Sequence, residues 1–242
     1  MTALRFVSHL SRHHDDAADR IFRLIGEKLG RVVHYEAGLP YRERREMVQR
    51  GDADVMWMCG YLSRELDTDV VAAPVFVGEQ APVYRTLILV LAGSSRRTMG
   101  DLRDSRLVIN ERESWSGHHA LASHLRPEGR LGQFFESVTE SGSHSASLEA
   151  LRQDRADCAA FDSSIWRVLP DGVTSRFRVA GMTRDWPAPP FSLSRRLDPT
   201  LRRQVTEALV ALDRPHPAVD DIVGIDGAAY EAMTRSVALN RL

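Results

Sequence analysis

Two serine-containing segments hold the residue types that best suit the binding of a small anion. The first, Ser114-Trp115-Ser116-Gly117, follows an apolar, strand-like run and opens a predicted helix. The first N–H groups of a helix have no partner within it and lie at the positive end of the helix dipole, so they attract anions. Serine hydroxyls add donors, and glycine lets the backbone approach a ligand closely. An ordinary serine cap of the helix is the alternative interpretation.

The second segment, Ser141-Gly142-Ser143-His144-Ser145, precedes another short predicted helix. His144 is suited to donate to an anionic ligand, although a histidine in a loop is often simply solvated. Asp162 follows a further apolar strand. Its carboxylate suits either a ligand amine or the cap of the next helix.

Two tyrosines complete the set of candidate site residues. Tyr61 comes directly after Cys59-Gly60, at the end of an earlier predicted strand. Its phenol is suited to a ligand, and the alternative is an ordinary packed aromatic ring. Tyr84 opens a strand that we expect to cross between two lobes, where its side chain would face a cleft.

Other chemistries lack the sequence patterns that they require. The pairs His13-His14 and His118-His119, with His124, do not have the spacing of a zinc site. Ser116 is not in a Gly-x-Ser-x-Gly turn, and the glycine fingerprints of common nucleotide-binding folds are absent. We therefore expect neither a metal nor a cofactor, and we assign no catalytic residue.

The composition narrows the range of partners. The chain has 242 residues and a formal net charge of -1, which removes the usual reason to expect nucleic-acid binding. Its apolar runs are too short to insert into a membrane as a spanning helix. The N-terminus lacks the pattern of a signal peptide, so the chain as written is expected in the cytoplasm; if a leader has been removed, the periplasm is expected.

Strand-like and helix-like segments alternate along the chain, which favours an α/β fold with mostly parallel sheets. The segments around Ala53-Asp54 and Ala156-Asp157 each leave a helix, turn and enter a strand. This repeat predicts two lobes of similar construction, and ligands of such lobes commonly bind between them. After Asp198-Pro199 we predict a helix, a break that contains two prolines, and a final helix from Ala228 to Leu239 that packs on the first lobe.

A series of short motifs runs through the chain in the order of a known family. The motifs are Gly51-Asp52-Ala53-Asp54-Val55, Gly60-Tyr61, Tyr84-Arg85-Thr86, Ser114-Trp115-Ser116-Gly117, Ser141-Gly142-Ser143-His144, Arg155-Ala156-Asp157, Asp162-Ser163 and Pro189-Pro190-Phe191. In this order they resemble the substrate-binding proteins of phosphate and phosphonate ABC transporters, which have the type 2 periplasmic-binding-protein fold. The resemblance implies an α/β fold of two lobes with mixed, mostly parallel sheets and a ligand cleft between the lobes. Lobe 1 would comprise residues 1–85 and 185–242, and lobe 2 residues 86–184.

The resemblance also implies a role for each candidate residue. Ser114, Ser116 and Gly117 would hold the phosphonyl oxygens, while Tyr61, Tyr84 and His144 would complete the anion cage. Asp162 would face a substituent such as an amine. Members of the family commonly have threonine between the two serines, whereas this chain has Trp115, which would narrow the site or stack on a ligand.

The function expected from these features is the binding of phosphate, phosphonate or a related oxyanion by a solute-binding protein. Closure of a hinge would couple capture to recognition by a partner, either the membrane subunits of an ABC transporter or a regulatory protein. Two alternatives remain open at this point. One is a cytoplasmic enzyme of the same fold that uses His144, Asp162 or His118 as acid–base groups. The other is a ligand sensor.

Overall fold

The structure is a computed structural model that describes residues 3–241. It divides into two compact units. Unit 1 comprises Met1–Val83 and Pro187–Thr234, and unit 2 comprises Tyr84–Trp186 and Arg235–Leu242. The lobe boundaries drawn from the sequence, 85/86 and 184/185, stay predictions. Each unit is described by itself below.

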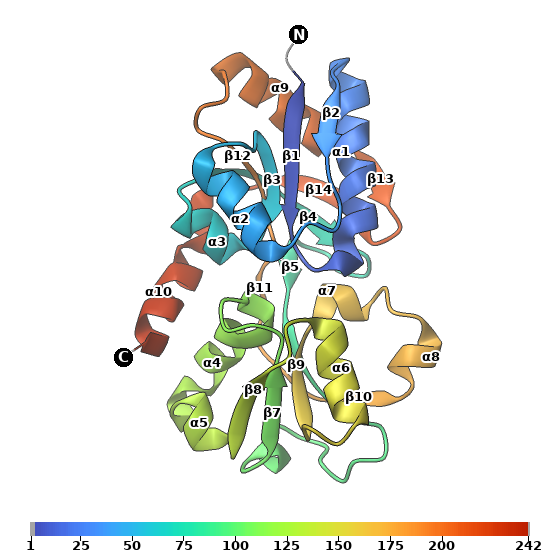
Figure 1. The fold of residues 1–242 in the computed structure, drawn as a ribbon, viewed down its shortest axis with the longest axis vertical. Helices are drawn as coiled ribbons and strands as arrows, with labels where there is room; N and C mark the ends of the chain where they lie inside the picture. Colours follow the sequence, from blue (N-terminus) through green and yellow to red (C-terminus); the bar gives the residue numbers. More distant parts are fainter. Residues whose placement is uncertain (1–2, 242) are drawn as a thin grey trace. The chain divides into compact units, whose positions relative to one another are not determined.

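Unit 1 is built on a seven-stranded mixed sheet with helices packed against it (Figure 1). Its strands are β1 (Leu4–His9), β2 (Val33–Tyr35), β3 (Val55–Met58), β4 (Asp69–Phe76), β12 (Phe191–Leu193), β13 (Asp213–His216) and β14 (Val219–Gly224). Its helices are α1 (Asp15–Leu29), α2 (Tyr41–Arg50), α3 (Gly60–Glu65) and α9 (Pro199–Val210), with the short 3₁₀ turns η1 (Arg12–His14) and η5 (Gly227–Tyr230). The strand order is β13-β14-β4-β12-β3-β1-β2, and parallel pairing joins β1 to both β2 and β3.

Unit 2 is built on a five-stranded mixed sheet. Its strands are β6 (Thr86–Leu91), β7 (Arg106–Ile109), β8 (Ser137–Glu140), β9 (Cys158–Asp162) and β10 (Phe177–Met182). Its helices are α4 (Ala120–Leu125), α5 (Leu131–Phe134), α6 (His144–Arg152), α7 (Ser163–Trp166) and α8 (Asp171–Thr174), with the short turns η2 (Gly100–Leu102), η3 (Trp115–His119) and η4 (Arg126–Glu128). The strand order is β10-β6-β9-β7-β8; β7 is parallel to β8 and β9, whereas β6 is antiparallel to β9 and β10.

The core of unit 2 lies on both faces of its sheet, because successive side chains of a strand point to opposite faces. On β6, Ile88 and Val90 belong to a core with α4 and α5, while Leu87 and Leu89 belong to a second core with α6 and α7. Because both faces are covered, β6 is continuously apolar from Leu87 to Leu91, and the sequence indicates it as an apolar run.

The chain crosses between the units at three places. The strands β5 (Val83–Tyr84) and β11 (Trp186–Pro187) pair as a separate two-stranded sheet, and the helix α10 (Glu231–Arg241) begins in unit 1 and ends in unit 2. In unit 2, Arg126 donates from Nη2 to the carbonyl of Ser236 at 3.1 Å, and Asn240 donates from Nδ2 to the carbonyl of His119 at 3.4 Å. The final helix was predicted to pack on the first lobe, and these contacts correct that expectation for its second half.

The repeat around the two Ala-Asp pairs is present in the structure as a repeated contact. In unit 1, the amide of Arg5 on β1 donates to Oδ2 of Asp54 at 2.8 Å, just before β3 begins. In unit 2, the amide of Arg106 on β7 donates to Oδ2 of Asp157 at 2.8 Å, just before β9 begins. In both units the strand that follows the aspartate is parallel to the strand that donates. Each aspartate therefore joins two neighbouring parallel strands by a hydrogen bond, and it does so just before the second of the two strands begins.

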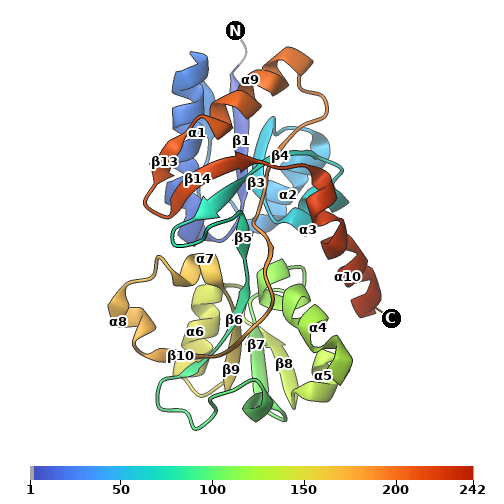
Figure 2. The ribbon, with the colours of Figure 1, turned by 180° about the vertical axis from the view of Figure 1, so that it is seen from behind.

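The segment between α9 and α10 is a β-hairpin, where the sequence predicted only a break between helices (Figure 2). β14 pairs antiparallel with β4 and extends the unit 1 sheet, and β13 is its edge strand. Pro215 lies in β13 and lacks an N–H, which an edge strand tolerates because one side of it has no neighbour. The expectation of a simple break between the two helices, with no further strand–helix repeat, was therefore wrong.

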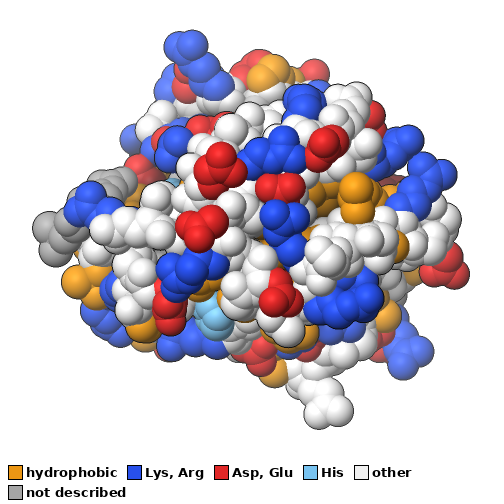
Figure 3. All heavy atoms as spheres, turned by 90° about the horizontal axis from the view of Figure 1, so that it is seen from below, with side chains coloured by type: hydrophobic (Ala, Val, Ile, Leu, Met, Phe, Trp, Pro, Cys, Tyr) orange, Lys and Arg blue, Asp and Glu red, His pale blue; other side chains and the backbone are white. Residues whose placement is uncertain are grey.

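The surface carries a mixture of charges. On the face drawn in Figure 3, basic and acidic side chains are interspersed over the surface. This mixture agrees with the formal net charge of -1. An anion site must then draw its positive potential from local groups, not from a broad basic field.

Candidate functional site

The candidate residues of unit 2 gather at the carboxyl edge of its sheet. The neighbouring strands β8, β7 and β9 are parallel, so their carboxyl ends lie at the same edge. Each is followed by a helical segment that starts at this edge: α6 after β8, η3 after β7, and α7 after β9. The antiparallel strand β6 begins there too, since Thr86 is paired with Asp162. The topology thus brings together segments from four separate places in the sequence.

The turn that begins at Ser114 is wider than an α-helical turn. The carbonyl of Ser114 accepts from the amides of both His118 and His119, each at 3.1 Å, and the second of these bonds spans five residues. The amide of Gly117 donates to Oγ of Ser114 at 3.0 Å, so the predicted serine cap is observed. The amides of Trp115 and Ser116 lie in the first turn, where no intrahelical acceptor exists. Such π-helical turns are found frequently at functional sites.

Gly117 is required by a close approach of two segments. A Cβ atom at this position would lie 1.5 Å from Oδ1 of Asn110, the residue that follows β7. The turn is also held from β6, because Thr86 donates from Oγ1 to the carbonyl of Ser116 at 2.7 Å. Ser116 itself is buried. These contacts fix the backbone of the η3 turn.

His144 is the first residue of α6, not a solvated loop residue. Its side chain is 3 % exposed, and its ring packs on Phe161 with centroids 4.9 Å apart. Ser143 caps the helix through Oγ, which accepts from the amide of Ala146 at 3.1 Å. The alternative of a solvated histidine is therefore excluded, while a role of His144 toward an anion stays a prediction.

Asp162 acts as the cap of α7, one of its two predicted roles. Its Oδ1 accepts from both the amide, at 2.8 Å, and the hydroxyl of Ser164. Tyr84 is buried on β5, next to Arg85, whose carbonyl accepts from the amide of Ser163. Asp162 and Tyr84 therefore belong to the same sheet edge as the helix starts, and their contact with a ligand stays a prediction.

Tyr61 lies in the first turn of α3 in unit 1, directly after β3. The backbone before it is tightly packed, since a Cβ on Gly60 would lie 2.0 Å from Cδ1 of Tyr230. Tyr61 is therefore in the equivalent place of the other unit, after the strand that the repeated Ala-Asp pair introduces. Its role toward a ligand is not tested by this placement.

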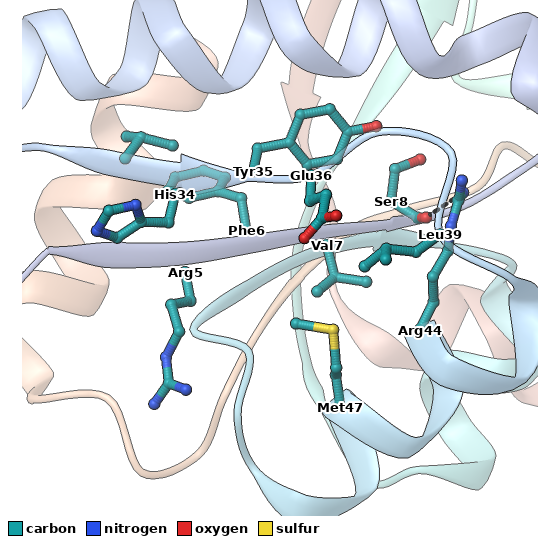
Figure 4. Close-up of a pocket in the computed structure, with 11 residues that line it drawn as sticks. Arg5, Phe6, Val7, Ser8, His34, Tyr35, Glu36, Leu39, Arg44 and Met47 are labelled. Atoms are coloured by element: carbon teal, nitrogen blue, oxygen red, sulfur yellow. Dashed lines mark hydrogen bonds between the residues drawn. The ribbon is translucent and has the colours of Figure 1, made fainter.

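A cavity of about 370 Å³ lies within unit 1 beside β1, β2 and α2 (Figure 4). Arg44, which is 2 % exposed, reaches across to the end of β1, where its Nη1 donates to the carbonyl of Ser8 at 2.7 Å. The same Nη1 donates to the carbonyl of Leu10 at 3.3 Å. Arg44 thus holds the chain that leaves β1, which is the counterpart in unit 1 of the edge described in unit 2.

Two titratable groups near the η3 turn, His118 and Glu111, have shifted pKa values and supply no positive charge near pH 7. Burial lowers the pKa of His118, although its Nδ1 lies 2.7 Å from the carbonyl of Arg112, a contact that raises it. His118 is therefore neutral near pH 7. Burial and the carboxylates of Glu140 and Glu113 raise the pKa of Glu111. Backbone amides of the η3 turn therefore contribute positive potential here beside the guanidinium groups of Arg112 and Arg184.

Two side chains at this edge were missed from the sequence. One is Asn110, which packs on the Cα atom of Gly117. The other is Trp186 on β11, whose ring lies 4.6 Å from that of Trp115 in an edge-to-face arrangement. The sequence near Asn110 and Trp186 does not indicate these contacts, because each contact joins segments that are distant in sequence or separated by a turn. No group of residues among 3–241 has the composition and spacing of a metal site.

A comparison with known families decides the classification. The sequence profile of the family described as "ABC transporter, phosphonate, periplasmic substrate-binding protein" matches residues 9–234. The chain belongs to this family. The resemblance inferred from the ordered motifs is thereby confirmed, as is the two-lobed type 2 periplasmic-binding fold with mixed sheets.

Solved structures show how widely the fold of this family is shared. A binding-protein component of an ABC phosphonate transporter from Pseudomonas aeruginosa is 13% identical, with a TM-score of 0.82 over 99% of this chain and 86% of that one. PhnD1 from Prochlorococcus marinus, solved in complex with methylphosphonate, is 14% identical, with a TM-score of 0.83 over 99% of both chains. A protein of Xanthomonas citri bound to ATP is 17% identical, with a TM-score of 0.72 over 100% of this chain and 98% of that one. At these identities the likeness concerns the fold.

A membrane-spanning helix must be both long and apolar. Within residues 3–241, no helix meets both requirements.

Proposed function

We propose that the chain binds a phosphonate, phosphate or related oxyanion at the carboxyl edge of the unit 2 sheet and presents it to the membrane subunits of an ABC transporter. The observation that carries the proposal is the η3 turn. There the first two amides, of Trp115 and Ser116, have no intrahelical acceptor, Ser116 adds a hydroxyl, and Gly117 lets Asn110 pack closely against the turn and hold it in place. Amide and hydroxyl donors bind an oxyanion without the need for a charged side chain.

Two relatives support a ligand with phosphorus-bound oxygens. The protein from Prochlorococcus marinus was solved with methylphosphonate, and the protein from Xanthomonas citri with ATP. Both ligands present a tetrahedral phosphorus with terminal oxygens that accept hydrogen bonds. We propose that this group lies over the η3 turn.

The remaining candidate residues take supporting roles in the proposal. Tyr84 and His144 would add donors from the neighbouring segments of unit 2, and Tyr61 is the contribution that we propose from unit 1. Asp162 would face the ligand's substituent with the carboxylate lone pairs that the cap of α7 does not use. Trp115 would border the substituent.

We propose that the protein acts in the periplasm, where the binding proteins of its family work, with the membrane subunits of a transporter as its partners. Fractionation of the native cells tests the location. Recovery of the protein with the periplasmic fraction is expected, and its retention with cytoplasmic markers would contradict the proposal.

Isothermal titration calorimetry with methylphosphonate, phosphate, ATP, sulfate and acetate tests the binding function. We expect at least one phosphorus oxyanion to bind more tightly than acetate. Ser116→Ala should weaken that binding about tenfold or more, because hydrogen bonds to charged groups contribute about 1.5–3 kcal/mol. Ser137→Ala is the matched control, since Ser137 begins β8 at the opposite edge of the sheet. Equal affinities of the two variants, or no binding of any oxyanion, would refute the proposal.

A further inference from the structure

Two buried indole N–H groups in unit 2 have no hydrogen-bond acceptor among the described residues. They are Nε1 of Trp115 and Nε1 of Trp186. The two side chains are 1 % and 3 % exposed, so bulk water does not satisfy these donors. A buried donor without an acceptor carries the full free-energy cost of leaving water, and it is rare in native proteins.

The contact between the two rings satisfies at most one of these donors. Their centroids are 4.6 Å apart and their planes meet at 77°. In such an edge-to-face pair one ring directs its edge at the face of the other, so only one of the two N–H groups can point at a π face. At least one indole N–H therefore still needs an acceptor.

The place of the indoles connects them to the proposed anion site. Trp115 lies between Ser114 and Ser116 in the sequence, in the first turn of η3. Trp186 lies on β11, which pairs with β5, the strand of Tyr84. An acceptor bound beside the η3 turn, on the carbon side of a phosphonate, would therefore lie next to the indoles.

The charges around the indoles favour an electron-rich group over a cationic one. The guanidinium of Arg184 lies 4.0 Å from the centroid of the Trp186 ring. This cation gives the indole surroundings a positive potential. The carboxylate that would receive a ligand amine, Asp162, is already an acceptor for two hydrogen bonds from Ser164.

We propose that Trp115 and Trp186 form a subsite that donates an indole N–H to an oxygen on the carbon chain of the ligand. The preferred ligand is then a phosphonate whose organic group carries an acceptor oxygen, as a hydroxyl or a carboxylate, in preference to a plain alkyl or an aminoalkyl phosphonate. This inference rests on the proposed oxyanion-binding function and specifies its ligand class.

Calorimetry with three phosphonates tests the preference. We expect 2-hydroxyethylphosphonate to bind about threefold to tenfold more tightly than methylphosphonate or 2-aminoethylphosphonate, which corresponds to one net hydrogen bond. Trp115→Phe or Trp186→Phe should weaken the binding of 2-hydroxyethylphosphonate selectively and so abolish this difference between the phosphonates. Trp166→Phe is the control, because Trp166 lies on α7 and packs against Phe161. Equal binding of all three phosphonates would overturn the inference alone, whereas no binding of any of them would overturn the proposed function together with it.

Indole resonances in ¹H–¹⁵N NMR spectra of the unsubstituted protein give a readout that does not depend on the folding of a variant. The signal of Trp115 or Trp186 should move downfield with 2-hydroxyethylphosphonate and much less with methylphosphonate. Trp57 is the internal reference, because its Nε1 already donates to the carbonyl of Pro189 at 2.9 Å. If both ligands shift the Trp115 and Trp186 signals alike, the inference is wrong.

Discussion

Replacement of Gly117 by alanine probes the close approach that shapes the η3 turn. The added Cβ would lie 1.5 Å from Oδ1 and 2.7 Å from Cγ of Asn110, so the Asn110 side chain must leave its position. Because Asn110 is 8 % exposed, it has little room to move. Overpacking of this kind costs about 1–3 kcal/mol, and the gain from replacing a helical glycine returns at most about 1 kcal/mol. We therefore expect Gly117→Ala to lower the free energy of unfolding by about 1–2 kcal/mol.

Urea denaturation followed by circular dichroism measures this change, and two further variants define its origin. Gly132→Ala on α5 is the control, because a Cβ there meets no atom within 4 Å, and it should leave stability unchanged or raise it. In an Asn110→Ala background the cost of Gly117→Ala should disappear, which gives a coupling energy of about 1–2 kcal/mol. The reasoning fails if Gly117→Ala is as stable as the original protein, or if the two substitutions are additive.

Three further predictions concern stability. Although partial burial opposes it, hydrogen bonds from Arg106 hold the pKa of Asp157 below its ordinary value, so the stability that it contributes is present at neutral pH and is lost as pH falls through the folded-state pKa. Asp157→Asn should cost about 1–2 kcal/mol at pH 7 and much less in acid, and an equal cost at both pH values would contradict this. Burial and two neighbouring carboxylates raise the pKa of Glu111, so its ionised form destabilises the fold as pH rises above the ordinary carboxyl range. Glu111→Gln should therefore raise Tm at pH 7 and leave Tm unchanged at low pH. A lower Tm of the variant at pH 7 would show that the ionised carboxylate stabilises the fold. Tyr230→Phe removes a 2.7 Å hydrogen bond to the carbonyl of Ala188 and should cost about 1–2 kcal/mol in urea denaturation, and an unchanged midpoint would show that the hydroxyl contributes nothing.

The fold could be predicted where local patterns coincide with the contacts that they produce. The Ala-Asp repeat is an example, because Asp54 and Asp157 each bind the amide of a residue on the neighbouring parallel strand. The helix after Asp198-Pro199 is another, since Oδ1 of Asp198 accepts from the amides of Thr200 and Leu201. The Asp198 cap joins residues close together in sequence, whereas the Asp54 and Asp157 contacts span 49 and 51 residues and could be expected only because the same pattern occurs twice in the chain.

The features that the sequence did not reveal depend on partners far along the chain. The hairpin of β13 and β14 has a charged, proline-containing sequence, and it is a strand pair because β4 offers an open edge. The sequence predicts a loop position for His144, but in the structure its ring packs against Phe161, which lies on β9. The sequence around Trp186 does not indicate a contact with Trp115, which lies 71 residues earlier; the contact is seen only in the structure, where Trp186 lies on β11.

The wide turn at Trp115–His119 has a consequence for how the chain tolerates a change in length. One residue advances an α-helix by about 100°, so an insertion within an ordinary helix would rotate every later side chain away from its partner. Here the bond from the amide of His119 to the carbonyl of Ser114 accommodates the additional residue before α4 begins. Leu121 and Leu125 keep their places in the core as a result. Deletion of one residue within this turn would therefore reshape the rim of the proposed anion site and leave the core of the unit in place. The rim can thus diverge in evolution independently of the core.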